Sequence, residues 1–563
     1  MKKPISFLLA VTLTTSLLLT GCSKGGSKSD STADATVTGA VTQAADGDTS
    51  TSSGDLGTSK FLKIVEITNP TTVDPQSTTE YYGVSMNVFN RLVEVQANGD
   101  GTSKIVPSLA DSWTISDDGL TYTFKLHEGV KFSNGADLTA DDVLYTFTRL
   151  LTYSKSQNGS TIDQIKGAAE LADGSAKTLE GFKIIDDYNF TITLKAPYAA
   201  FLACLSTPAA SILDRDTTEA AGDDFGIVPE KTIGSGYFIF KQWDVNSQYV
   251  MVANKNCWAG APKSEGIVVK IVPDADTQRM MFESGEIDIL DLDNAQSQTD
   301  YFLKNDTYKN QIVSGNRVGI YYIAMNQSYK PLSDVRVRKA IQMVIDRQGL
   351  LDALFGGRGT LENGIFPVGL IGHNNNLPAL TYDVEGAKKL MAEAGYADGF
   401  DLEISQSSEA GNTTVQTNQI IQAMLGEIGI KVKINVLDDA TYMDKRAAGE
   451  IQMYNTNWSA DFNDPDNFIY TFFGTAENTK GRCFCYPDTA TIKRVTDARA
   501  IVKDDERIAE YQALEKKIVQ DDACWVPLYS VKHLFVVNPR VKNFTVSWNG
   551  WSNNYYQNVS IED

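Results

Sequence analysis

The sequence predicts an α/β protein with more than one domain, and three observations support this prediction. The chain has 563 residues, and domains of about 100 to 200 residues would make it two to four domains long. Apolar residues make up 42% of the chain and charged residues 21%, which is ordinary for globular proteins. From Phe61 onward, short β-rich runs alternate with amphipathic helical stretches, and this alternation is typical of α/β domains.

Three segments predict β-hairpins. In Ser112–Leu126 the turn pair Asp118-Gly119 lies between two runs of alternating apolar and polar residues, which is a strong local hairpin signal. Phe182–Leu194 and Gly236–Val252 each contain two β-rich runs around a polar turn. We therefore expect antiparallel strand pairs in all three segments.

Helical periodicity and capping residues predict the helices. Thr139 followed by Asp142 has the form of a capping box, which would begin a helix that runs to about Leu150. Arg336, Arg338 and Arg347 are expected on polar helix positions. The other expected helices are Asp334–Leu351, Val384–Ala394, Thr413–Ile428 and Asp504–Asp521, and the expected later strands are Lys431–Leu437 and Trp525–Tyr529.

The N-terminal region predicts export and lipid anchoring. Lys2 and Lys3 precede an apolar run from Ile5 to Leu19 that is too short to span a bilayer. Leu19-Thr20-Gly21-Cys22 resembles the bacterial lipobox, which implies a signal peptide at 1–21 and lipid attachment at Cys22. Residues 22–60 contain no aromatic residue, so they predict a flexible tether. Anchoring on the extracytoplasmic face of the cell membrane is expected, in a bacterium of Gram-positive type rather than in a periplasm.

Charge and cysteine content exclude several functions. A formal net charge of −21 would repel nucleic acid and anionic membrane surfaces. Five cysteines follow Cys22, so at least one thiol stays free, and the pairing of the others is open. Cys483 and Cys485 lack the two-residue gap of common zinc sites, and the three histidines are scattered, so no metal and no cofactor are expected. The chain lacks a Gly-x-Ser-x-Gly elbow and a His-Glu-x-x-His motif, so it is not expected to be an enzyme.

An ordered series of short segments resembles the family 5 solute-binding proteins, the oligopeptide, dipeptide and nickel binders of ABC importers. The first group of matching segments is Ser108–Trp113, Asp118–Phe124, Gly129–Gly135 and Leu138–Val143. The later segments are Ile233–Tyr237, Ser284–Asp288, Asp334–Ile341 with Asp346-Arg347, and Ala392–Tyr396. The resemblance covers essentially all of the chain after the tether.

This resemblance implies a two-lobed, periplasmic-binding-protein-like fold of type II, cluster C, with a small additional domain and a ligand cleft between the lobes. The expected first lobe comprises 61–91, 182–273 and 527–563, the accessory domain 92–181, and the second lobe 274–526. Two crossings near Pro273 and Pro527 are the expected hinge. A monomer is expected, with ABC permease subunits and their cytoplasmic ATPases as partners.

The resemblance places the ligand site in the segment Asn457–Pro465. Asp461 matches the aspartate that meets the α-ammonium of a peptide in the oligopeptide binders. A peptide amine buried by closing lobes loses its water, so a fixed carboxylate avoids a cost of several kcal/mol. Trp458 is expected to stack on the ligand, and Asn463 is expected to contact it. The ligand would be a short peptide held in an extended form.

Further ligand contacts are expected on both lobes. Arg446 falls where the oligopeptide binders supply an arginine toward the peptide carboxylate, and its planar fork suits that group. Asn455 stands where some relatives have a second arginine, which leaves peptide length open. The residues expected on the first-lobe rim are Tyr81, Tyr82, Gly234, Ser235 and Tyr237.

Alternative functions are a non-peptide solute in the same fold, such as a nickel chelate, a sugar or haem, and a peptide-sensing receptor without import. A calcium loop at Asp461 to Phe472 fails, because Pro465 stands at its fifth position, Asp466 replaces the turn glycine and Phe472 replaces the final glutamate. Asp464 is expected to cap the helix that follows it.

Overall fold

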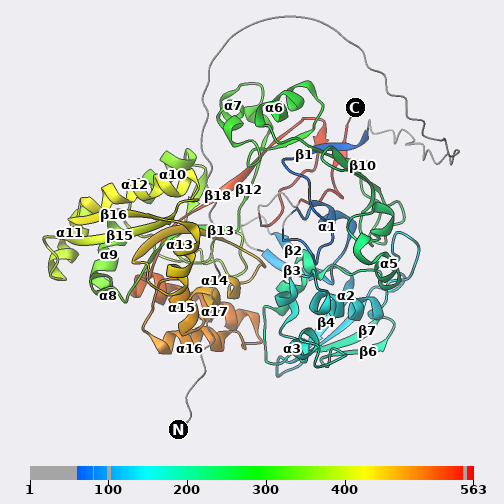
Figure 1. Ribbon diagram of the computed structural model, residues 1–563, viewed down its shortest axis with the longest axis horizontal. Coiled ribbons are helices and arrows are strands. Elements are labelled where there is room, and N and C mark those ends of the chain that lie inside the picture. The colour runs from blue at the N-terminus through cyan, green and yellow to red at the C-terminus, as the bar shows by residue number, and fades with distance from the viewer. Residues whose placement is uncertain (1–59, 80, 98–102, 550–553, 563) are drawn as a thin grey trace, which may run out of the picture. The chain divides into compact units, whose positions relative to one another are not determined.

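Helices and strands alternate through the part of the chain that the computed structural model describes, which is residues 60–79, 81–97, 103–549 and 554–562. This part folds into the two-lobed, type II arrangement that the sequence predicts (Figure 1). The signal peptide, Cys22 and the tether lie outside the described residues. No helix among the described residues is both long and apolar enough to cross a membrane.

The first sheet has four strands in the order β1-β10-β9-β8. Its strands are β1 (Leu62–Glu66), β8 (Phe238–Asp244), β9 (Gln248–Ala253) and β10 (Gly266–Ile271). β1 pairs in parallel with β10, and the other pairs are antiparallel. The hairpin predicted at Gly236–Val252 is confirmed, and Asn246 supplies the positive φ (61°) of its turn. The helices nearby in the sequence are α1 (Gly83–Val88), α4 (Phe201–Leu205) and α5 (Arg215–Ala221).

The second sheet is antiparallel, in the order β4-β5-β7-β6. Its strands are β4 (Ala110–Ile115), β5 (Thr121–Leu126), β6 (Phe182–Asp186) and β7 (Asn189–Thr193), and the nearby elements are β2 (Val93–Ala97), β3 (Ser103–Pro107), α2 (Ala140–Thr152) and α3 (Ala168–Ala172). Both predicted hairpins of this sheet are confirmed. The capping box formed by Thr139 and Asp142 at the start of α2 is also confirmed.

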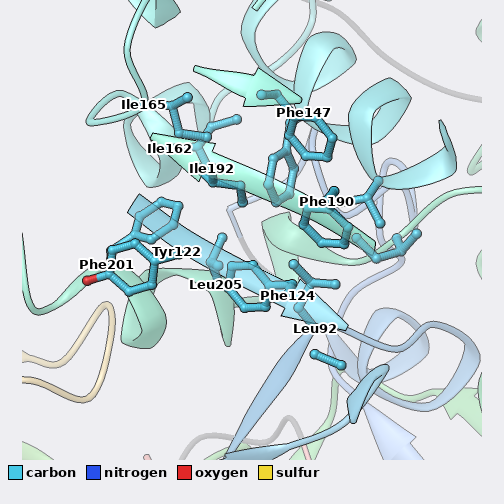
Figure 2. Packing of buried hydrophobic residues seen from close by; sticks show 14 of the residues in the cluster. Leu92, Tyr122, Phe124, Phe147, Ile162, Ile165, Phe190, Ile192, Phe201 and Leu205 are labelled. Atoms are coloured by element: carbon cyan, nitrogen blue, oxygen red, sulfur yellow. The ribbon is translucent and has the colours of Figure 1, made fainter. Parts of the chain in front are cut away.

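The core of this sheet is aromatic (Figure 2). The rings of Phe124 and Phe190, from neighbouring strands, stack with their centroids 5.3 Å apart. Because β7 pairs with β5 and β6 pairs with β7, residues 182–193 belong to the same sheet as β4. The accessory-domain boundary at residue 181 stays a prediction, and it falls immediately before β6 of this sheet.

The large sheet has the order β11-β18-β13-β17-β15-β16, with β12 and β14 also paired to β18. Its strands are β11 (Ile289–Asp291), β12 (Ile312–Asn316), β13 (Gly319–Met325), β14 (Gly359–Leu361), β15 (Phe400–Ser407), β16 (Ile430–Leu437), β17 (Met453–Ser459) and β18 (Trp525–Val537). A last short pair joins β19 (Val541–Lys542) and β20 (Ser560–Ile561). The strands predicted at Lys431–Leu437 and Trp525–Tyr529 are confirmed, although β18 runs further than expected.

Helices accompany the strands of this large sheet. They are α6 (Ala275–Ser284), α7 (Thr299–Lys304), α8 (Lys330–Ser333), α9 (Val335–Val344), α10 (Arg347–Phe355), α11 (Val384–Glu393), α12 (Asn412–Gly426), α13 (Asp439–Ala447), α14 (Asp466–Phe473), α15 (Ala476–Gly481), α16 (Thr489–Ala498) and α17 (Asp504–Lys516). The predictions for α11, α12 and α17 are confirmed to within a few residues, with a π-helical turn at Lys517–Asp521 after α17.

The helix predicted at Asp334–Leu351 is two helices. The chain breaks between α9 and α10, where the Asp346 side chain accepts from the Gly349 N–H at 2.8 Å and caps the second helix. The expectation that Arg338 and Arg347 occupy polar surface positions is wrong, since both are buried. The guanidinium groups donate to main-chain carbonyls instead, as Arg338 does to the Asp522 carbonyl.

The two connections between lobes are β12–β13 and β18. The first half of β18 pairs with β13 and β14, whereas residues 532–537 pair with β11 and β12. Asp288, just before β11, exchanges hydrogen bonds with Lys63 of β1, so the segment 274–316 packs with the first lobe. The crossings near Pro273 and Pro527 stay predictions, and the partner strands of β18 change between Val531 and Lys532.

Glu515 is a fully buried carboxyl group in the second lobe. One of its oxygens accepts from the N–H groups of Ile365 and Phe366, at 2.7 and 2.8 Å. The pKa of Glu515 is raised to about 8, mainly by burial and also by the neighbouring carboxylate of Glu362, although these hydrogen bonds act to lower it. The folded protein therefore holds a proton that the unfolded chain releases at a much lower pH.

We expect wild-type stability to fall as the pH rises toward 8. A pKa raised in the folded state stabilises the fold below the unfolded pKa, and this stabilisation is lost as the pH rises through the folded value, by up to about 1.4 kcal/mol per pH unit. Glu515→Gln should flatten the decline, because its side chain carries no charge at any pH. Urea denaturation of both proteins between about pH 5 and 8 checks this. Parallel stability curves for the two proteins would contradict the assignment.

Candidate ligand-binding site

A cavity of about 620 Å³ lies where three separate stretches of the chain meet. It is lined from the first stretch by Thr79 and Tyr82; from the second by Asn158, Ser160, Thr161, Asp163, Gln164, Tyr198, Cys204, Thr207, Pro208 and Ala209; from the third by Ala460, Asp461, Phe462, Asp466, Asn467, Tyr470, Thr471 and Arg499; and by Asn549. Both lobes therefore contribute to it, and its wall contains aromatic rings as well as polar groups.

Asp461 stands in the loop between β17 and α14. Its N–H donates to Asn467 Oδ1 at 3.0 Å, and its carboxylate accepts from Asn467 Nδ2 at 2.9 Å. Asp464 accepts from the Asp466 N–H at 2.9 Å, but the N-cap of α14 is Pro465 and has no side-chain cap hydrogen bond, so the prediction that Asp464 caps this helix is not confirmed. The loop is thus held by side-chain hydrogen bonds at both ends, and Asp461 has a defined position.

Asp461 is an exposed residue that lines the cavity. Burial raises the pKa of Asp461, while the hydrogen bond from Asn467 and the positive charge of Arg482 lower it. No ion pair joins Asp461 to a Lys, Arg or His among the described residues. The Arg482 guanidinium instead lies over the Trp458 ring, 4.8 Å from its centroid. Asp461 therefore offers a negative charge to a ligand.

Asp466 carries a second charge in the cavity wall, and this charge is compensated. Its carboxylate accepts from the hydroxyl groups of Tyr198 at 3.0 Å and Tyr511 at 3.2 Å, and it pairs with Arg499 Nε at 2.9 Å. The Arg499 guanidinium also lies 3.8 Å from the centroid of the Tyr470 ring. Because Tyr198 belongs to the hydrophobic cluster of the second sheet and Asp466 begins α14, this polar cluster joins segments far apart in the chain.

The structure brings Asp461 and Tyr82 into the cavity but not the other predicted residues of the second lobe. Trp458 packs on Phe472, with ring centroids 5.5 Å apart, and donates to the Asn467 carbonyl. Asn463 is fully buried. Its side-chain oxygen accepts from the Ile371 N–H, and its side-chain NH₂ group donates to the Gly369 carbonyl. Arg446 lies on α13, near the hydroxyl group of Tyr442. None of these three lines the cavity.

Most of the residues predicted on the first-lobe rim of the cleft have structural roles. Tyr81 has a positive φ (58°) and bonds Thr68. At Gly234 an added Cβ would stand 2.1 Å from the Val88 carbonyl oxygen, so glycine is required there by packing. Ser235 is buried and donates to Asn90 Oδ1, and Tyr237 packs on the core of the first sheet.

Sequence reasoning missed the polar residues of the accessory-domain wall, such as Asn158 and Asp163, and the pairing of Asp466 with Arg499. No local sequence motif predicts these residues, because they come together in the cavity wall only in the folded chain. The one available signal was the acidic run after Asp461, which the calcium-loop comparison considered only as a set of metal ligands.

One group among the described residues has donors close enough for a metal ion, namely Asp291, Asp293 and His533. His533 Nε2 lies 2.6 Å from Asp291 Oδ1 and 3.5 Å from Asp293 Oδ2. Arg317 forms an ion pair with Asp293 at the same place. A cation of the protein itself thus already compensates this group, which lies at the crossing between the lobes. The five described cysteines are free thiols.

Two lobes joined by two strands, with a cavity lined from both of them, define this protein as a two-lobed binding protein of type II. The family described as "Bacterial extracellular solute-binding proteins, family 5 Middle" matches residues 104–480. The chain belongs to this family of transport proteins.

Individual relatives match along nearly the whole chain. The heme-binding protein A of Haemophilus influenzae is 30% identical over 500 residues, covering 86% of this chain and 88% of the relative. The dipeptide-binding protein of Escherichia coli is 30% identical over 524 residues, covering 88% and 93%. The structure of HbpA2 from Haemophilus parasuis superposes with a TM-score of 0.76 at 28% identity, covering 89% of this chain and all of that one.

Proposed function

We propose that this protein captures short peptides in the cavity between its lobes and delivers them to the membrane permease of an ATP-driven importer. The observation that carries the proposal is the Asp461 carboxylate, which lines the cavity and forms no ion pair with any cationic side chain in the described part of the chain. A peptide α-ammonium supplies the missing charge, and main-chain hydrogen bonds bind peptides of many sequences. The name of the dipeptide-binding relative supports the same ligand class.

The cellular setting is part of this proposal. Cys22 would carry the lipid that holds the protein on the extracytoplasmic face of the cell membrane, and residues 23–60 would let the binding lobes reach the permease. The protein would act as a monomer without catalysis, since capture and release need only opening and closing of the lobes. Closure is favoured by contacts that the ligand makes with both lobes at once, as Tyr82 and Asp461 allow.

The proposal is tested by the ligand that the protein carries. Native mass spectrometry of protein purified from its host should show bound peptides of a few residues, and calorimetry should show binding of trialanine. A haem-binding protein is among the relatives, so a co-purified tetrapyrrole with its visible absorption bands, together with no binding of trialanine, would overturn the peptide assignment.

Peptide affinity should depend on pH through Asp461. The peptide ammonium, with a pKa near 8, stays charged throughout the acid range. Burial raises the pKa of Asp461, so its charge, and with it the affinity for trialanine, should be lost at a higher pH than an ordinary aspartate (about 3.9) would predict. Calorimetry between about pH 7 and pH 4 measures this loss. Asp461→Asn serves as the reference, and an equal acid loss in this variant would assign the effect to another group.

A further inference from the structure

Gly119, at the turn between β4 and β5, has a buried position that the hairpin alone does not require. Asp117 and Asp118 beside it are exposed, whereas Gly119 is buried. Its positive φ (70°) suits a turn glycine, but an added Cβ would also lie 2.6 Å from Val502 Cγ2 and 3.2 Å from Pro197 Cβ. Val502 lies between α16 and α17. The tip of this hairpin is therefore covered by a segment from a distant part of the chain.

A main-chain hydrogen bond joins the same two regions. The Ala199 N–H donates to the Arg499 carbonyl, at the C-terminal end of α16, at 3.1 Å. The hydroxyl group of Tyr122 on β5 donates to the Tyr198 carbonyl at 3.1 Å, which holds the chain before Ala199 to the second sheet. We call this contact the seam, with residues 119 and 197–199 on one side and residues 499–502 on the other.

The seam adjoins the ligand cavity but is separate from it. The described lining of the 620 Å³ cavity includes neither Gly119 nor Val502. A gap of about 40 Å³ remains within the seam, which is far below the roughly 300–1,000 Å³ of small-molecule sites. Tyr198 and Arg499 belong both to the seam and to the cavity wall. The seam is thus a contact surface between two parts of the protein.

The two sides of the seam are attached to different sheets. β4, β5, β7 and α2 share one hydrophobic cluster, and Arg149 of α2 forms a buried ion pair with Asp74, after β1, at 2.8 Å. This side is therefore tied to the first sheet. On the other side, α16 and α17 contribute Val495 and Tyr511 to a cluster of the large sheet. A movement that separates the two lobes must break the seam.

We propose that the seam is a latch that stabilises the closed arrangement of the lobes, so that the Asp118-Gly119 turn controls ligand affinity without touching the ligand. A contact that exists only in the closed arrangement lowers the free energy of that arrangement. A ligand that binds the closed arrangement then binds more tightly. This inference goes beyond the proposed function, because closure of the lobes applies to any solute.

Gly119→Ala tests the latch, because the added Cβ would press on Val502 and hold the two sides of the seam apart. Gly129→Ala is the matched control, since Gly129 also has a positive φ (77°) but an added Cβ there meets nothing within 4 Å. Both variants carry the strain of alanine at a positive φ. Val502→Ala removes Cγ2 and leaves the Val502 Cβ 3.9 Å from the added atom, so the double variant should close again.

Hydrogen exchange of a proteolytic fragment that contains Ala199 measures opening of the seam without any ligand. Exchange should be about tenfold faster in Gly119→Ala than in Gly129→Ala, and calorimetry should show about tenfold weaker binding of trialanine. In Gly119→Ala/Val502→Ala both values should return to within about twofold of those of Val502→Ala. Val502→Asp places a charge in the seam with the hairpin turn unchanged, and it should also speed exchange at Ala199.

The outcomes separate the latch from the proposed function. Equal exchange and equal affinity in Gly119→Ala and Gly129→Ala overturn the latch. A loss in Gly119→Ala that Val502→Ala does not relieve assigns the clash to Pro197, on the same side of the seam, and overturns the latch as well. If trialanine does not bind the wild type, the proposed peptide ligand fails, whereas exchange at Ala199 still decides whether the latch exists.

Discussion

Asp461→Asn should weaken the binding of trialanine by about 30- to 4,000-fold, which corresponds to about 2–5 kcal/mol. The variant removes the negative charge that faces the peptide α-ammonium and keeps an oxygen for the hydrogen bond that Asn467 donates. The bound ammonium would then lose its water without gaining a counter-charge. Isothermal calorimetry measures the loss, and the melting temperature of the variant should match that of the wild type.

A matched control and a modified ligand sharpen this prediction. Asp444→Asn removes a charge from an exposed position on α13 and should leave the affinity unchanged. N-acetylated trialanine lacks the ammonium, so it should bind the wild type weakly and lose nothing more in Asp461→Asn. Unchanged affinity of Asp461→Asn for trialanine would contradict the assignment of this carboxylate.

Arg507→Met should lower the free energy of unfolding by about 3–5 kcal/mol. Arg507 Nη1 lies 2.8 Å from Asp464 Oδ1, and both side chains are almost completely buried. Removing the arginine leaves a buried carboxylate uncompensated, and the cost of that charge exceeds the value of the pair itself. Because Asp464 also bonds the first N–H of α14, the Asp461 loop should loosen and peptide affinity should fall as well.

The exposed pair of Arg494 and Glu510 is the natural comparison, since its separation is also 2.8 Å. Arg494→Met should cost no more than about 1 kcal/mol, because water already screens these charges. Adding Asp464→Asn to Arg507→Met should restore part of the stability by removing the unpaired charge. Urea denaturation of the wild type, the two single variants and the double variant measures these free energies of unfolding. A loss of free energy of unfolding below about 1 kcal/mol for Arg507→Met would refute the role assigned to the buried pair.

The elements that sequence reasoning placed correctly depend on residues close together in the chain. The turn at Asp118-Gly119 and the capping box of Thr139 and Asp142 are local, and both occur as predicted. The helix expected at Asp334–Leu351 was wrong for a local reason too, because Asp346 caps a new helix in the middle of an otherwise helical pattern. Arg338 and Arg347 were misplaced because buried main-chain carbonyls, which no periodicity reveals, accept their guanidinium groups.

The sequence by itself determined the family and the two-lobed α/β architecture. Both follow from short motifs in a fixed order, which can be recognised in the sequence without the tertiary structure. The tertiary structure alone decided which side chains share the cavity: it placed Asp163, Tyr198 and Asp461 in one cavity wall, and it left Arg446 outside that wall. The physical reason is that burial and the pairing of charges depend on contacts between residues far apart in the chain, as between Tyr198 and Asp466.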